Sequence, residues 1–103
     1  MIHRITLDDP GDYLDYRLGM GDSVEIYDIA IHSERRRGRG RQLVNLMLEN
    51  VRANYPTTRQ VFAITRISNT IAHEFYEALG FNIIGRLHYF YVDEHALMYG
   101  IRL

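Results

Sequence analysis

Apolar and polar residues alternate in three segments near the start of the chain, residues 1–7, 13–18 and 23–32. A two-residue period sends alternate side chains to opposite faces of a β-strand. Proline, glycine and aspartate are concentrated between these segments, in residues 8–12 and 19–22, where they favour tight turns. The pattern therefore predicts three consecutive antiparallel strands.

The pattern changes to a helical period in the middle of the chain. Leu43, Met47 and Val51 recur at every fourth residue, which places them on one side of an α-helix. We expect an amphipathic helix over residues 39–54, followed by a short apolar strand over residues 61–65.

A second helix is predicted after residues 68–70, whose hydroxyl and amide side chains can cap a helix start. Ile71, Phe75 and Leu79 follow at helical spacing and are expected to form its buried face. Gly80 is expected to end it, because glycine accepts the left-handed conformation that often follows a helix.

Residues 81–92 and 96–103 have the composition of two further strands, joined at residues 93–95. The predicted order is β-β-β-α-β-α-β-β, in a single domain that covers residues 1–103. This order predicts an α+β fold with a mixed, mostly antiparallel sheet and two main helices.

The composition excludes several kinds of chemistry. The chain contains no cysteine, so it has no disulfide, thiolate nucleophile or cysteine-ligated zinc. His3, His73, His88 and His95 show no metal-ligand spacing, and we expect no metal site. The longest apolar runs are too short to span a membrane, and the first residues lack the apolar segment of a signal peptide. We therefore expect a cytoplasmic protein that does not associate with membranes.

Charge is distributed unevenly, although the net charge is only −1. Residues 1–31 contain seven acidic residues and two arginines, whereas residues 32–66 contain eight arginines and two glutamates. This asymmetry indicates one region for an anion and another that tolerates a cation.

A glycine-containing motif, Arg35-x-x-Gly38-x-Gly40, connects the third predicted strand to the first predicted helix. Unpaired N–H groups at a helix start attract anions, and glycine lets the backbone approach a phosphate closely. The motif resembles the (Gln/Arg)-x-x-Gly-x-(Gly/Ala) signature of GNAT acetyltransferases, whose loop wraps the pyrophosphate of acetyl-CoA.

Residues 69–81 resemble the second signature of the same family, Asn-x-x-Ala-x-x-Phe-Tyr-x-x-x-Gly-Phe. The matching residues are Asn69, Ala72, Phe75, Tyr76, Gly80 and Phe81. The two blocks lie within residues 23–92 and are similar to those of a short GNAT acetyltransferase. The resemblance implies the GNAT acyl-CoA N-acyltransferase fold, and transfer of an acetyl group from acetyl-CoA to a primary amine.

One departure from the family concerns the site of the acceptor. Family members usually have one or two helices between their first two strands, and these helices form a wall of the acceptor site. Only residues 8–12 separate the two strands here. The wall is therefore absent or supplied by another subunit.

The resemblance also implies where acetyl-CoA binds. Backbone amides of residues 27–31 would bind the acetyl carbonyl, often through a bulge, and N–H groups of residues 38–41 would bind the pyrophosphate. We expect one or two of the five nearby arginines to contact phosphate and the others to be solvated. Asn69 would bond the pantetheine arm, cap the second helix, or do both. The implied cofactor-binding residues are Ile29, Ile31, Arg35, Arg36, Arg37, Gly38, Arg39, Gly40, Arg41 and Asn69.

Tyr76 is the implied general acid. A phenol with a reference pKa of about 10 is protonated at neutral pH and can donate to a departing thiolate. The alternative role for Tyr76 is packing at the surface. Glu25 is the first candidate for the general base, followed by Asp28 and His32. Glu25 could instead be a solvated strand residue, with water acting as the base. Strand alternation places Glu25 and Asp28 on opposite faces.

Three alternatives remain open from the sequence. The acceptor could be a protein lysine, a peptide N-terminus or a small cationic amine. The protein could bind CoA without catalysis. Residues 35–41 could form an arginine-rich nucleic-acid-binding module, although the rest of the chain is acidic. We also expect a homodimer, because the unpaired edge strands of so small a sheet favour pairing with another chain.

Overall fold

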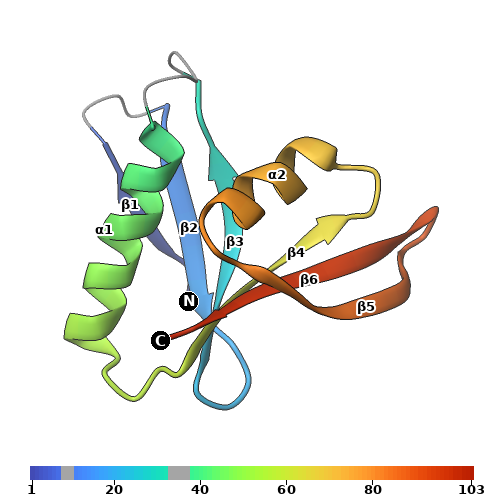
Figure 1. Cartoon of the computed structure of the whole chain (residues 1–103). Helices are drawn as coiled ribbons and strands as arrows, with labels where there is room; N and C mark the ends of the chain where they lie inside the picture. Colours follow the sequence, from blue (N-terminus) through green and yellow to red (C-terminus); the bar gives the residue numbers. More distant parts are fainter. Residues whose placement is uncertain (8–10, 33–37) are drawn as a thin grey trace.

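A computed structural model describes residues 1–7, 11–32 and 38–103. The described residues form six strands and two helices in the predicted order, which confirms the α+β class (Figure 1). The elements are β1 (His3–Thr6), β2 (Tyr13–Leu18), β3 (Ser23–Ala30), α1 (Arg39–Asn54), β4 (Gln60–Arg66), α2 (Thr70–Ala78), β5 (Asn82–Tyr91) and β6 (Glu94–Arg102).

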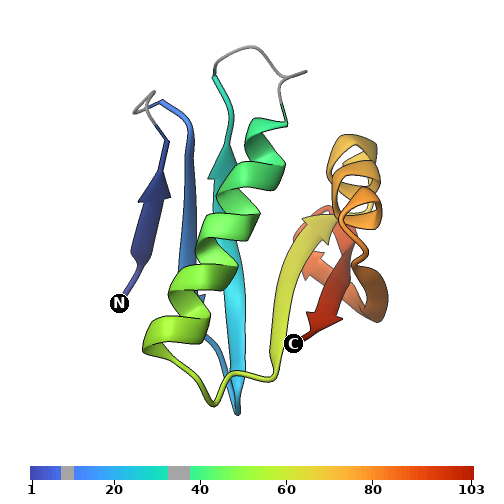
Figure 2. The ribbon, with the colours of Figure 1, turned by 60° about the vertical axis from the view of Figure 1, so that its left-hand side comes forward.

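The strands form one mixed sheet in the order β1-β2-β3-β4-β6-β5. Only β3 and β4 are parallel, and every other neighbouring pair is antiparallel. Parallel neighbours need a long crossover connection, and α1 supplies it by crossing one face of the sheet (Figure 2). The pairings of β1 with β2 and of β2 with β3 confirm the predicted antiparallel arrangement of the first three strands.

The core lies between that face and the two helices. It contains the four buried residues of α1, which have the predicted helical spacing, together with Tyr76 of α2. Burial of one aliphatic side chain of α1 stabilises the fold by about 1.5–3 kcal/mol. The other core residues are Leu14, Tyr16, Val24, Ile26, Val61, Ala63, Phe81, Leu97 and Tyr99.

A β-bulge interrupts the pairing of β2 with β3. Tyr16 pairs with Ile26 and Asp15 pairs with Asp28, so Tyr27 has no partner in β2. The extra residue reverses the alternation of side chains beyond it. Asp28 therefore shares with Glu25 the face of the sheet away from α1, and the prediction that the two acids lie on opposite faces is wrong.

β3 and β4 separate along their length. They pair from Ser23 with Gln60 to Ile26 with Ala63. Beyond these residues β3 continues against β2, and β4 continues against β6. The facing edges of two central strands therefore diverge in the middle of the sheet.

The ends of α2 agree with the sequence. The Asn69 side chain accepts a hydrogen bond from the Ala72 N–H at 3.1 Å, so the predicted N-cap is confirmed. Gly80 follows the helix with a φ of 89°. The Gly80 N–H donates to Glu77 O and the Phe81 N–H donates to Tyr76 O, which is the Schellman pattern.

The predicted buried face of α2 is wrong for Ile71, whereas Phe75 and Leu79 are partly buried and pack against the core as predicted. Ile71 is 67% exposed, whereas Tyr76 is 5% exposed and belongs to the core. The reason is that α2 packs on the sheet through Tyr76, while Ile71 and Phe75 line a cavity between the helices. Helical spacing alone gave no means of separating a cavity lining from a core.

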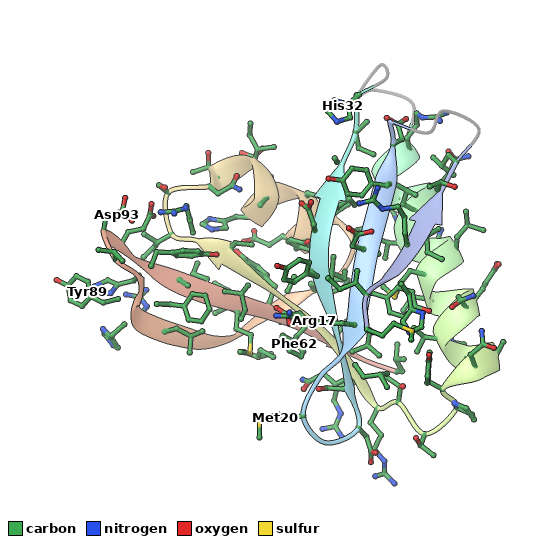
Figure 3. All side chains as sticks on the ribbon, turned by 180° about the vertical axis from the view of Figure 1, so that it is seen from behind. Arg17, Met20, His32, Phe62, Tyr89 and Asp93 are labelled. Atoms are coloured by element: carbon green, nitrogen blue, oxygen red, sulfur yellow. The ribbon has the colours of Figure 1, made fainter. Side chains whose placement is uncertain are left out.

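The final hairpin also differs from the prediction. Val92 and Asp93 form the turn, and Glu94 already pairs with Tyr91, so only Asp93 of the predicted connection, residues 93–95, lies in the turn. Tyr89 and Asp93 lie near the tip of this hairpin (Figure 3). β5 is an outer strand of the sheet and exposes several apolar side chains. The homodimer stays a prediction.

A hydrogen bond from the Tyr99 hydroxyl to Glu77 Oε2, 2.7 Å long, ties α2 to β6. Burial, and then this bond, raise the pKa of Tyr99 to about 12. A folded-state pKa above the unfolded value near 10 stabilises the fold at lower pH, and this stabilisation is lost as the pH rises from about 10 to 12.

We predict that Tyr99→Phe lowers the free energy of unfolding by about 1 kcal/mol at neutral pH and reduces its alkaline decline. Denaturant titrations at several pH values measure both effects. Tyr89→Phe is the matched control, because Tyr89 is 70% exposed. Equal alkaline declines in the wild type and Tyr99→Phe would contradict the prediction.

Candidate functional site

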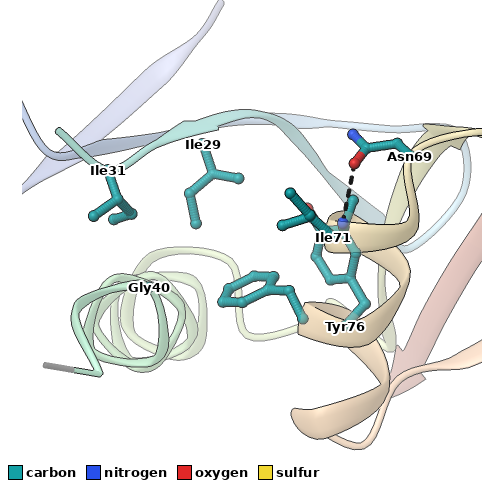
Figure 4. A pocket seen from close by; sticks show the side chains of 8 residues that line it. Ile29, Ile31, Gly40, Asn69, Ile71 and Tyr76 are labelled. Atoms are coloured by element: carbon teal, nitrogen blue, oxygen red, sulfur yellow. Dashed lines mark hydrogen bonds between the residues drawn. The ribbon is translucent and has the colours of Figure 1, made fainter. Parts of the chain in front are cut away.

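A cavity of about 430 Å³ lies between the start of α1, α2 and the end of β3 (Figure 4). Most of its lining is apolar, with the Asn69 amide and the Tyr76 hydroxyl as polar groups. The lining residues are Ile29, Ile31, Gly40, Asn69, Ile71, Ala72, Phe75 and Tyr76. The two sequence motifs, far apart in the chain, therefore form the walls of one cavity.

The start of α1 presents backbone N–H groups at this cavity. Gly38 is the N-cap and has φ 65° and ψ 25°, a left-handed conformation that favours glycine. The helical ladder begins with the bond from the Gln42 N–H to Gly38 O at 3.0 Å. The N–H groups of Gly40 and Arg41 precede that ladder, and Gly38 has no side chain to cap them. Such a helix start is suited to an anion.

Gly40 allows the two helices to approach. A Cβ atom at this position would lie 2.6 Å from Cε1 of Phe75, a distance that real Cβ contacts do not show. Glycine in the first motif and phenylalanine in the second are therefore coupled by direct packing. This contact sets the width of the cavity next to the start of α1.

Asp12 is a further residue of this site, although the sequence indicates only a turn at residues 8–12. It is fully buried and accepts hydrogen bonds from the His32 N–H at 2.6 Å and from Arg39 Nε at 2.5 Å. These contacts connect the end of β3 to the start of α1. No local pattern indicated this role, because the partners are 20 and 27 residues away in the sequence.

Two arginines at the start of α1, Arg39 and Arg41, make contacts within the protein. Arg39 is ion-paired with Asp12, and its side chain is 17% exposed. Arg41 Nη2 donates to Ala78 O at 3.2 Å, at the end of α2. The expectation that arginines without a phosphate contact are solvated is therefore wrong for Arg39, whereas Arg41 is exposed. Arg35, Arg36 and Arg37 lie outside the described residues.

Tyr76 lies at the inner end of the cavity. Its ring packs against Phe75, Phe81 and Tyr99, with centroids 5.2, 5.3 and 5.9 Å away. Its hydroxyl has no hydrogen-bond partner among the described residues and is not sealed from the cavity. Burial, and then the charge of Asp28, raise the pKa of Tyr76. The hydroxyl therefore stays protonated and can donate to a ligand.

A second cavity, of about 280 Å³, lies where β3 and β4 separate. It shares Ile29, Asn69, Ala72 and Tyr76 with the first cavity. Its other lining residues are Ile26, Tyr27, Asp28, Ile64, Thr65, Arg66 and Tyr91. The two cavities therefore adjoin at the four residues that they share, next to the place where β3 and β4 separate.

The structure separates the candidate general bases. Glu25 accepts a bond from Arg17 Nε at 2.8 Å and does not line either cavity. Asp28 lines the second cavity and accepts a bond from the Tyr13 hydroxyl at 2.8 Å. His32 lies two residues beyond the end of β3 and lines neither cavity (Figure 3). Of the three, only Asp28 is brought to the opening.

The part of the chain that the structure describes offers neither a metal-binding cluster nor a membrane-spanning helix. Within it, there is no group of three or more histidine or acidic side chains that could hold a metal ion. Neither of its helices is both long and apolar enough to cross a membrane.

Residues 14–92 match the model of the FR47-like protein family. The chain belongs to this family, and with it to the GNAT acetyltransferase superfamily. No curated protein matches the sequence. The predicted family and the GNAT fold are therefore confirmed.

Solved structures agree over almost the whole chain. A protein assigned to the GNAT acetyltransferases from Desulfovibrio desulfuricans is 26% identical, with a TM-score of 0.78 over 95% of this chain and 64% of its own. An acetyltransferase from Bacillus subtilis, in complex with CoA, is 19% identical, with a TM-score of 0.81 over 96% of this chain and 73% of its own.

A GNAT family acetyltransferase from Elizabethkingia anophelis, with acetyl-CoA bound, is 16% identical, with a TM-score of 0.82 over 96% of this chain and 72% of its own. The fold described above thus occurs in acetyltransferases that bind CoA or acetyl-CoA. This chain spans about two thirds to three quarters of the length of these proteins.

We predict that Asp12→Ala lowers the free energy of unfolding by about 3 kcal/mol, because it leaves the Arg39 guanidinium without its buried partner. Chemical denaturation measures the change, and an Asp12→Ala/Arg39→Ala double variant should recover part of it. Asp93→Ala is the control, since its ion pair with Arg66 is exposed and contributes at most about 1 kcal/mol. A loss no larger than that of the control would contradict the assigned role of Asp12.

Proposed function

We propose that this protein is an N-acetyltransferase that moves the acetyl group of acetyl-CoA directly to a primary amine. The observation that carries the proposal is that the two cavities share the lining residues Ile29, Asn69, Ala72 and Tyr76. The first cavity lies next to the N–H groups at the start of α1, and the second lies where β3 and β4 separate. The hydroxyl of Tyr76 lies where the two cavities adjoin.

The start of α1 would hold the pyrophosphate of acetyl-CoA. The N–H groups of residues 38–41 supply donors, and the positive end of the helix favours the anion. Since Arg39 and Arg41 already contact Asp12 and Ala78, we assign the phosphate-binding guanidinium groups to Arg35, Arg36 and Arg37.

The apolar lining of the first cavity suits the pantetheine arm. The pantetheine arm would lie along Ile29 and Ile31, and the side-chain amide of Asn69 would donate a hydrogen bond to it. The Asn69 oxygen is already used by the helix cap. Beyond Ile26, β3 pairs only with β2, so its backbone groups on the other edge face the opening. These groups can bind the thioester carbonyl as negative charge develops on its oxygen.

The chemical step requires a neutral amine next to the thioester carbon. The amine nitrogen forms a bond to this carbon, the carbon–sulfur bond breaks, and the sulfur leaves as a thiolate. Tyr76 donates its hydroxyl proton to the thiolate, and the proton released by the new amide nitrogen restores the phenol. The products are the N-acetyl amine and CoA with a free thiol. Positioning of the two reactants supplies most of the rate.

An arginine-rich nucleic-acid module is disfavoured by the same geometry. A module of this kind would direct its guanidinium groups to solvent, where they can reach phosphates. Arg39 is instead paired with a buried carboxylate, and its side chain is only 17% exposed. The experiment that tests the proposed function is incubation with labelled acetyl-CoA and a library of amines, followed by mass spectrometry. Binding of acetyl-CoA with no labelled product would show that the protein is a binding protein without catalysis.

We predict that Tyr76→Phe lowers kcat by about tenfold or more and changes the Kd for acetyl-CoA by less than about threefold, since the hydroxyl acts on the leaving thiolate. Steady-state kinetics and calorimetry measure the two constants. Tyr89→Phe removes a hydroxyl at the exposed hairpin tip and should leave both unchanged. An unaltered kcat in Tyr76→Phe would remove Tyr76 from the mechanism.

Gly38 and Gly21 offer a matched test of the helix start. Both have a positive φ, 65° and 64°, and a Cβ atom at either would meet no described atom within 4 Å. We predict that Gly38→Ala and Gly21→Ala each cost about 1 kcal/mol of folding free energy. Only Gly38→Ala should weaken acetyl-CoA binding, by about fivefold. Calorimetry measures the Kd of each variant for acetyl-CoA. Equal affinities of the Gly38→Ala and Gly21→Ala variants would contradict a pyrophosphate site at Gly38.

A further inference from the structure

Three acidic residues of β2 and β3 share the face of the sheet away from α1, and two of them have their own cation. Asp15 accepts bonds from Nε and Nη2 of Arg4 at 2.7 and 2.9 Å. Glu25 accepts a bond from Nε of Arg17 at 2.8 Å. Both carboxylates are therefore neutralised within the sheet.

Asp28, the third acid, differs from the other two. Its Oδ2 accepts a bond from the Tyr13 hydroxyl at 2.8 Å, and no described cation forms an ion pair with it. The charge of Asp28 contributes to the raised pKa of Arg4, but the guanidinium of Arg4 is bonded to Asp15. Asp28 is thus an exposed carboxylate at the opening whose hydrogen-bond partner is a neutral phenol.

Among the described residues, Arg66 is the one arginine that lines the second cavity, and it does not supply the missing charge. Arg66 Nη1 contacts Asp93 at 2.9 Å and Glu94 at 3.2 Å. Two carboxylates therefore oppose one guanidinium there. Together with Asp28, they give the cavity and its rim an excess of negative charge.

We infer that the second cavity admits an alkylammonium group, and that Asp28 is the specificity-determining residue that attracts it. This inference rests on the proposed acetyltransferase function and names the class of acceptor. The Tyr13 hydroxyl fixes one oxygen of Asp28 and leaves the other available to the cavity. Ile26, Ile29 and Ile64 of the lining suit the methylene groups of an aliphatic amine.

The proton balance is compatible with this role. An alkylammonium that reaches Asp28 loses one proton to solvent, and the neutral nitrogen then attacks the thioester carbon. It loses a second proton as the amide forms, and this proton ends on the departing sulfur through Tyr76. Asp28 raises the local concentration of the acceptor. An amine with its own carboxylate next to the aliphatic chain would be repelled.

The test compares kcat/KM for three amines with one chain length, 1-aminobutane, 1,4-diaminobutane and 4-aminobutanoate, at saturating acetyl-CoA. Nα-acetyl-lysine methylamide is included to distinguish a lysine side chain from a free small amine. We expect the wild type to prefer 1-aminobutane to 4-aminobutanoate by about tenfold, and Asp28→Asn to reduce this preference by about fivefold. Asp22→Asn is the control, because it removes one carboxylate from the turn before β3, outside both cavities.

The outcomes separate this inference from the proposed function. A preference for 4-aminobutanoate, or an unchanged preference in Asp28→Asn, would overturn the inference, while the turnover itself would support the acetyltransferase. Binding of acetyl-CoA without turnover of any amine would overturn both. A second measurement needs no variant, because kcat/KM of the wild type for 1,4-diaminobutane should fall with salt as the attraction is screened. A kcat/KM independent of salt would also count against the role of Asp28.

Discussion

The separation of β3 from β4 is the constraint on which the candidate site depends. Hydrogen bonding between these strands ends at Ile26 and Ala63, although both strands continue. An unpaired strand edge inside a sheet leaves backbone groups without partners, so this opening is a place where a ligand can complete the hydrogen bonding. The bulge at Tyr27 lies beside it and turns Asp28 to the face away from the helices.

The helices determine what can reach the opening from the other face. α1 and α2 approach closely because Gly40 has no side chain to meet Phe75, and the space that remains between them is the apolar cavity. Asp12 holds both the end of β3 and the start of α1. A buried carboxylate with these two contacts fixes the position of the helix start relative to the strand. A ligand that contacts both elements must fit the distance between them.

Much of the fold and part of the site could be predicted from the sequence. The two-residue period located the first three strands, the four-residue period located both helices, and apolar composition located the other three strands. The Asn69 cap could be predicted because its partner is three residues away. The role of Asp12 could not be found, since its contacts are with residues 20 and 27 positions away in the chain. The orientations of Asp28 and Ile71 were predicted wrongly for related reasons. A bulge and a cavity each break the periodicity from which a face is assigned, and neither is encoded by local spacing.

Titration of the labelled protein with acetyl-CoA, followed by amide NMR shifts, tests the central claim most directly. The account predicts that the largest shifts occur at the N–H groups of Gly40 and Arg41, where the pyrophosphate binds, and at Ile29 beside the opening. Shifts confined to other parts of the chain, or an absence of shifts at saturating acetyl-CoA, would contradict it.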